Sequence, residues 1–197
     1  LLAYIEGFAD TDVLDRDIIT PLLTKKSSDK KSLLYTSRLK CISGLEEAVN
    51  GILAGNILLL MDGETEAFLL TLPLLVRRSI EEPNNESVVR GPKEGFVESI
   101  KTNIILTRRK IKSPDLKIET LTIGRVTQTE VALVYLKGIV DTDVLQEVRR
   151  RLGRIDTDSI LETGYIEQYI QDHKYSPYPT LGITEKPDVV AGKLLEG

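Results

Sequence analysis

The sequence carries few side chains that could serve as a nucleophile, a general base or a metal ligand. Its one histidine is His173, which lies in a polar stretch, and its one cysteine is Cys41, which precedes a predicted helix. Enzyme sites combine a nucleophile with a base, a pair of carboxylates or several metal ligands. A lone histidine and a lone cysteine supply none of these sets, and one cysteine excludes an internal disulfide. We therefore interpret both residues as structural, with Cys41 as a small core residue, and we expect the chain not to be an enzyme.

Aspartate is plentiful and recurs in one pattern. Three Asp-Thr-Asp triplets begin at Asp10, Asp141 and Asp156. A calcium loop needs a glycine and a closing glutamate at fixed spacing after such a triplet, and that spacing is missing here. Aspartate is also a preferred helix N-cap, because its carboxylate accepts hydrogen bonds from the first N–H groups of the helix. Helix caps and turns explain the triplets better than a metal does, and neither nucleotide fingerprint is present. We expect no metal and no cofactor.

The best candidates for ligand binding lie in and just after a segment rich in proline, glycine and polar residues. They bring fixed charge and hydrogen-bonding groups close together in sequence: Arg90, Lys93, Glu94, Glu98, Asn103 and Arg108. Arginine suits a carboxylate and glutamate suits an ammonium group, so a zwitterionic amino acid is a plausible ligand if these residues line a cleft between two lobes. The same residues could instead form salt bridges that set the orientation of the lobes. Both interpretations remain open.

An internal repeat organises the elements that must position these residues. Residues 4–14 read YIEGFADTDVL and residues 135–145 read YLKGIVDTDVL, an offset of 131 with seven of eleven positions identical. Such self-similarity indicates a duplicated structural unit. In each copy an apolar strand ends at a glycine, and Asp10 or Asp141 follows where a helix needs an N-cap. The repeat predicts two strand-turn-helix units.

A weaker similarity preserves the order of the repeat. Residues 47–55 resemble residues 189–197 at an offset of 142. In the first copy this predicted helix leads into two apolar runs around Asp62-Gly63, a pattern typical of a β-hairpin. In the second copy the sequence stops where the corresponding hairpin is expected. We therefore expect the chain to begin and end part-way through a unit of a longer protein.

These patterns predict an α/β protein with two small lobes related by the repeat, each with a mixed sheet flanked by helices. We expect a first lobe over residues 1–82, a linker over residues 83–95 and a second lobe over residues 96–197. The second lobe is expected to contain a helix over about 96–111, paired strands over 116–124 and 131–137, and helices over 142–154 and 160–171. An ordered turn is expected over 175–179.

The bulk composition excludes several classes of protein. With 41% hydrophobic and 28% charged residues, the 197-residue chain has the composition of an ordinary globular protein rather than a disordered one. The net charge is −4, and the basic clusters are embedded among acidic residues, which argues against nucleic acid as a partner. No apolar run reaches the length of a membrane span and no signal peptide opens the chain, so we expect this stretch to be soluble.

Several ordered motifs resemble those of GerA-type spore germination proteins. The resemblance is carried by the sequence from Val89 to Glu98, by Asn103 and Arg108-Arg109, and by the runs 112–116, 164–168 and 185–188. It is strong over residues 83–197 and moderate over the first half. It implies the large hydrophilic N-terminal region of a receptor A subunit, in a full-length protein embedded in the inner membrane of the endospore.

Two functions are consistent with that resemblance. Members of the family work with B and C subunits and respond to small nutrients such as amino acids, sugars, nucleosides or ions, so the chain could bind a germinant between its lobes or transmit its binding through a change in their angle. It could instead be a scaffold that docks the B or C subunit, for instance through the arginine face of the helix over 142–154. Fold analogy does not separate the two.

Overall fold

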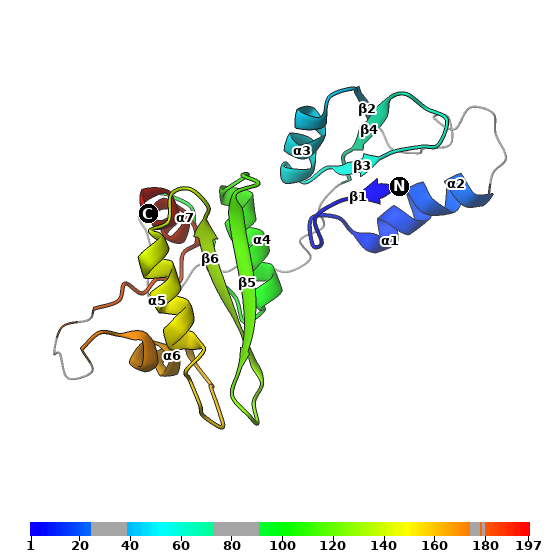
Figure 1. Cartoon of the computed structure of the whole chain (residues 1–197). Helices are drawn as coiled ribbons and strands as arrows, with labels where there is room; N and C mark the ends of the chain where they lie inside the picture. The colour runs from blue at the N-terminus through cyan, green and yellow to red at the C-terminus, as the bar shows by residue number, and fades with distance from the viewer. Residues whose placement is uncertain (25–38, 73–90, 174–177, 179) are drawn as a thin grey trace. The chain divides into compact units, whose positions relative to one another are not determined.

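The computed structural model describes residues 1–24, 39–72, 91–173, 178 and 180–197 (Figure 1). The described residues up to 72 form one compact unit together with 112–114, and the described residues 91–111 and from 115 onward form a second unit. Most of the predicted linker over 83–95 and most of the predicted turn over 175–179 lie outside the described residues. The domain boundaries at 82 and 95 therefore stay a prediction.

The first unit is built on a four-stranded antiparallel sheet with the strand order β1-β3-β4-β2. The strands are β1 (Leu2–Ala3), β2 (Leu39–Ile42), β3 (Ile57–Leu59) and β4 (Ala67–Leu70). The hairpin β3-β4 confirms the expectation from the two apolar runs around Asp62-Gly63. Gly63 has a φ of 85°, which is a conformation that glycine adopts without the steric cost of a Cβ.

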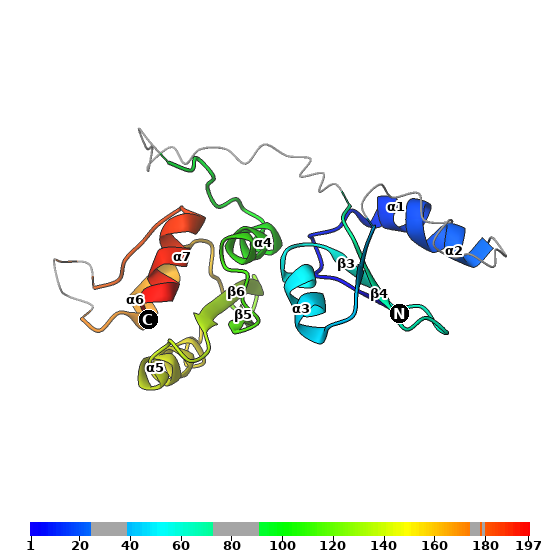
Figure 2. The ribbon, with the colours of Figure 1, turned by 90° about the horizontal axis from the view of Figure 1, so that it is seen from above.

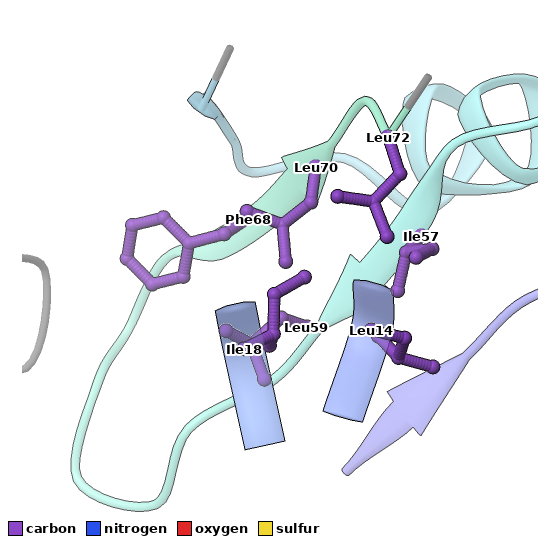
Figure 3. Packing of buried hydrophobic residues seen from close by; sticks show 7 residues of the cluster. All are labelled: Leu14, Ile18, Ile57, Leu59, Phe68, Leu70 and Leu72. Atoms are coloured by element: carbon purple, nitrogen blue, oxygen red, sulfur yellow. The ribbon is translucent and has the colours of Figure 1, made fainter. Parts of the chain in front are cut away.

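Helices cover both faces of this sheet (Figure 2). One face packs against α1 (Thr11–Leu14), the π-helical turn η1 (Asp15–Ile19) and α2 (Thr20–Thr24), and the other packs against α3 (Leu45–Leu53). Leu14 and Ile18 point from the first group onto Ile57, Leu59, Phe68, Leu70 and Leu72 (Figure 3). Alternate side chains of a strand point to opposite faces, so Leu58 and Leu69 face α3 instead.

The second unit is built on the antiparallel hairpin of β5 (Leu116–Ile123) and β6 (Thr129–Leu136). On one face Leu116 and Leu136 pack against Ile111, which follows α4 (Ile100–Lys110), and against Ala191 of α7 (Pro187–Glu196). On the other face Ile123 packs in a cluster with residues of α5 (Thr142–Leu152) and α6 (Thr163–Ile170). Figure 2 shows β5 and β6 between α4 and α5.

The expected α/β class, with sheets flanked by helices, is confirmed, and the helices and strands predicted for the second lobe are present. The sheets differ from the mixed ones that we expected, because every strand pair in the described residues is antiparallel. The interpretation of Cys41 as a core residue is wrong: its side chain is exposed. Cys41 lies in β2 at the edge of the sheet, and its neighbour Ile42 points to the opposite face and is buried.

The sequence repeat is also a repeat of local structure. Gly7 and Gly138 have φ angles of 85° and 88° at the same point of the turn. In both turns a backbone N–H closes a four-residue turn, from Phe8 to the carbonyl of Ile5 at 3.1 Å and from Ile139 to the carbonyl of Leu136 at 3.2 Å. The helix that follows covers one sheet face in each unit, and α3 or α7 covers the other.

Candidate functional site

The predicted ligand-binding residues come from the segment before α4 and from α4 itself. Arg90 lies outside the described residues. Lys93 and Glu98 are exposed on the segment that precedes α4, and Arg108 is half-buried on the last turns of α4. Two members of the set, Glu94 and Asn103, hold the segment before α4 in place through specific contacts.

Glu94 is held by cations of its own unit. Its carboxylate lies 2.9 Å from the Lys110 ammonium group and 3.8 Å from the Arg109 guanidinium. The side chains of the pair with Lys110 are partly buried, since 25% of Lys110 and 32% of Glu94 is exposed. Since α4 carries both cations in its last turn, they also face the negative end of the helix dipole. Glu94 therefore fixes the incoming segment to the end of α4.

Asn103 fixes the same segment to the start of α4. Its side-chain amide donates to the carbonyl of Val97 at 2.6 Å, and its amide oxygen accepts from the N–H of Val97 at 2.8 Å. This reciprocal pair satisfies a backbone donor and acceptor that belong to no helix or strand. The Ser99 hydroxyl accepts from the N–H of Thr102 and caps the helix. The amide of Asn103 is thus used within the fold.

The motif at residues 91–96 meets the motif at residues 185–188. The N–H of Phe96 donates to the carbonyl of Glu185 at 2.7 Å. Directly after Glu185, Lys186 is 5% exposed and Pro187 begins α7, a position where the missing N–H of proline costs nothing. One carboxylate oxygen of Asp188 is buried with no hydrogen-bond partner in the described residues. Two motifs that are far apart in sequence therefore form one junction.

A cavity of about 470 Å³ lies between β6 and α7. Its walls come from β6, from the turn after β6, from residues 182–184 and from α7; they include Val134, Leu136, Val140, Ile183, Val190 and Leu194. The lining is almost wholly aliphatic, with Thr184 and Lys193 among its few polar members. An aliphatic cavity of this size suits apolar side chains. The lysine in its lining, Lys193, already contacts the carboxylate of Glu196 at 2.7 Å.

A polar triad joins α5 to the hairpin on the opposite face. Arg149 donates to both carboxylate oxygens of Glu119, with Nε at 2.9 Å from Oε2, and the Tyr135 hydroxyl donates to Oε1 of the same carboxylate at 2.7 Å. The bidentate guanidinium and the tyrosine hydroxyl together lower the pKa of Glu119. The same contacts raise the pKa of Tyr135 and of Arg149. The triad orients α5 on the sheet.

The other arginines of α5 are also paired. Arg150 and Arg151 both donate to the carboxylate of Glu147, and Arg151 reaches Asp172 at 2.6 Å. The two guanidinium groups lower the pKa of Glu147 to about 2. An arginine face whose charges are matched by carboxylates of the same unit is a weaker docking surface than the sequence suggested.

Other classes of site receive no support from the described part of the chain. Within it, no three histidine, cysteine, aspartate or glutamate side chains converge as metal ligands would. His173 is exposed. No helix that the structure describes has the length and apolar character of a membrane span.

Sequence reasoning missed the triad and the cavity. Tyr135, Glu119 and Arg149 come from three different elements, up to 30 positions apart, and only the alternation of β5 and β6 hinted that Glu119 and Tyr135 share a face. The cavity has no signal in the sequence, because it depends on how α7 lies against β6.

The fold and the site define the chain as a helix-flanked α/β protein whose polar junction groups are engaged in internal contacts. A family model described as "Bacillus/Clostridium GerA spore germination protein" matches residues 1–197. Spore germination protein KA of Bacillus subtilis is 41% identical over 98% of this chain, and spore germination protein B1 of the same organism is 32% identical over all of it. The chain spans 37% and 42% of the lengths of these relatives.

A solved structure agrees with the sequence comparison. The N-terminal domain of the A subunit of the Bacillus megaterium spore germinant receptor GerK3 matches all of this chain and 74% of its own length, with 35% identity and a TM-score of 0.67. An uncharacterized membrane protein of Bacillus subtilis, YfkQ, is 36% identical over the whole chain and is covered to 40%. The chain belongs to the GerA spore germination protein family, as the sequence motifs predicted.

Proposed function

We propose that this chain is the N-terminal region of the A subunit of a spore germinant receptor and that it transmits the germination signal through contacts with the other receptor subunits. The family match over residues 1–197 and the likeness to the GerK3 A-subunit domain support the receptor context. The partners are the B and C subunits. The full-length protein lies in the inner membrane of the endospore, with this region as a hydrophilic part.

The observation that carries this proposal is the engagement of the junction groups. Glu94 was the expected partner for an ammonium group, and it already contacts Lys110 and Arg109. Asn103 was an expected hydrogen-bonding ligand, and its amide is bonded to the backbone of Val97. Opening these contacts for a ligand would leave charges and backbone groups unpaired, which is costly. A rigid junction is better suited to transmitting a displacement than to holding a nutrient.

Binding of a small germinant is the second candidate function. Arg108 favours it, since this half-buried guanidinium has no ion pair among the described residues and could accept a carboxylate. Arg90, Lys93 and Glu98 would complete such a site. The two functions differ in whether a small ligand binds to this region at all. In either case the chain acts without catalysing a reaction.

Ligand-detected NMR of the chain against amino acids, sugars, nucleosides and salts separates the two functions. We expect no saturable binding to the folded protein. Saturable binding that disappears in both Arg90→Ala and Arg108→Ala, and persists in the exposed-site control Arg154→Ala, would establish the germinant-binding function instead.

Spores that carry the full-length receptor test the transmission role. Asn103→Asp keeps the acceptor for the N–H of Val97 but removes the donor to its carbonyl. We expect this variant to slow germination at an unchanged receptor level, with the same nutrient concentration required for half-maximal response. A shift of that concentration without a loss of maximal rate would point to ligand binding.

A further inference from the structure

The two edges of β6 differ. The N–H of Lys137 donates to the carbonyl of Asp115 at 2.9 Å, so this pair is a hydrogen-bonded pair of the antiparallel ladder. Hydrogen-bonded and non-hydrogen-bonded pairs alternate along an antiparallel ladder. The next hydrogen-bonded pair is therefore Tyr135 with Lys117. Ala132 and Val134 therefore direct their N–H and C=O groups away from β5. Within the part of the chain that the structure describes, no strand pairs with that second edge.

The first unit shows what occupies the corresponding edge. At the repeat offset of 131, Leu1 corresponds to Ala132 and Ala3 corresponds to Val134. Leu1 exchanges two hydrogen bonds with Leu60, both 2.8 Å long, and Ala3 pairs with Leu58. The edge of β1 that is equivalent to the second edge of β6 is thus filled by β3.

The faces of the two strands agree with this correspondence. Ala3 packs in the cluster beneath α3, and Val134 packs in the cluster beneath α7. The helices α3 and α7 begin at Leu45 and Pro187, which is the offset of 142 found in the sequence. Gly55, two residues after the end of α3, has a φ of 93°, and its counterpart Gly197 has a φ of 106°. In the first unit β3 leaves directly from this glycine turn.

The aliphatic cavity lies beside the second edge of β6 and under α7, where the first unit has β3 under α3. It is lined by Val134 and Leu136 of β6, by Val190 and Leu194 of α7 and by Gly197. Ile183, which also lines it, is 65% exposed. In the first unit Leu58 of β3 fills the equivalent space between the sheet and α3 and is buried. An edge with free backbone groups beside an apolar cavity is the geometry of a strand-addition site, in which the backbone gives affinity and a side-chain cavity gives specificity.

We propose that the second edge of β6 binds an apolar β-hairpin of the same polypeptide, the counterpart of β3 and β4, whose first strand runs antiparallel to β6. An aliphatic side chain of that strand, the counterpart of Leu58, occupies the cavity under α7. The relatives of this chain are more than twice its length, so proteins of this family have further residues that can supply the hairpin. With it, the second unit acquires counterparts of β1, β3 and β4 in the same order, and β5 lies on the other edge of β6.

The test grafts the hairpin of the first unit onto the second. A chain in which Gly197 is followed by a second copy of residues 56–72 is compared with the chain itself by amide hydrogen exchange. We expect exchange at the N–H groups of Ala132 and Val134 to slow by about tenfold or more, with the methyl groups of Ile183 and Val190 shifting as the cavity fills. Unchanged exchange in a folded, grafted chain would overturn the proposal.

Two matched controls make the result specific. A graft of the same residues in scrambled order should give no protection, and equal protection by it would contradict a defined strand site. Ala132→Pro removes one of the two donors on the second edge without touching the bonds to β5, so it should reduce the protection of Val134 in the grafted chain. If protection appears only in a dimer, as measured by light scattering, the strand comes from a second copy and the intramolecular proposal fails.

Discussion

Asp10 and Asp141 cap two helices in the same way, although 131 positions separate them. Oδ1 of Asp10 accepts from the N–H groups of Asp12 and Val13 at 3.0 and 3.3 Å. Oδ1 of Asp141 accepts from the N–H groups of Asp143 and Val144 at 2.8 and 3.3 Å. The identity of the two sequences at these positions therefore reflects one local hydrogen-bonding scheme that occurs once in each unit.

Replacing the cap of α5 should weaken the second unit. Asp141→Ala leaves two N–H groups of the helix without their acceptor, and we expect a loss of about 1 kcal/mol in the free energy of unfolding. Asp141→Ser restores an acceptor and should recover most of the loss. Urea denaturation followed by the NMR signals of residues in α5 measures both, and equal stability of the alanine and serine variants would contradict the role of the cap.

Gly51 is needed for the contact between α3 and the sheet. A Cβ at this position would lie 2.6 Å from Cδ2 of Leu69 and would also clash with Cδ1, and Leu69 is 6% exposed. We expect Gly51→Ala to destabilise the first unit by about 1–3 kcal/mol through overpacking. The matched change Gly192→Ala on α7 meets no atom within 4 Å and should stabilise by about 0.5–1 kcal/mol. Thermal or urea unfolding of the two variants would show opposite shifts.

The guanidinium of Arg149 is the main cause of the lowered pKa of Glu119, and the hydroxyl of Tyr135 is the second. Arg149→Ala should therefore raise the pKa of Glu119 toward the ordinary range, and Tyr135→Phe should raise it less. A carboxyl NMR titration of Glu119 measures both shifts. Arg154→Ala, which removes the same charge from an exposed position on the chain, should leave this titration unchanged. A larger effect of Tyr135→Phe would refute the assigned order.

The stability of the second unit should depend on pH through Glu147. Its pKa falls from an ordinary 4.5 to about 2 in the folded protein because Arg150 and Arg151 hold the charged form. A lowered folded pKa contributes stability above the unfolded pKa, and that contribution disappears as pH falls toward the folded pKa. Between about pH 5 and about pH 2.5, the free energy of unfolding should thus fall less in Glu147→Gln than in the parent chain. Urea unfolding at the two pH values measures the difference. Glu130→Gln changes an exposed position on β6 and should show the same fall in the free energy of unfolding as the parent chain.

Much of the local structure could be predicted because its causes are local. The helix over 142–152 follows from the apolar spacing of Val144, Leu145, Val148 and Leu152 and from one cap. The hairpin of β5 and β6 follows from alternation and a turn. The strand β2 was not predicted, since its pairing with β4 joins residues more than twenty positions apart, and Cys41 was misplaced because the edge position of β2 is a property of the whole sheet.

The candidate site shows where such prediction ends. The motifs around Glu94, Asn103 and Glu185 were each identified in the sequence as motifs of one family, but neither their junction nor their contact partners were predicted. Lys110 and Val97, rather than a ligand, contact Glu94 and Asn103 in the structure. The binding role of the set, including Arg90, stays a prediction.

By itself the sequence determined the family, the duplicated strand-turn-helix unit and the positions of most helices and strands, because periodicity, capping and turn formation act over a few residues. Only the tertiary structure decided which polar groups are already paired, which arginines of α5 contact carboxylates and where the aliphatic cavity lies. Those properties depend on strand register and on which helix covers which sheet face, and contacts such as that between Phe96 and Glu185 join residues that the sequence keeps far apart.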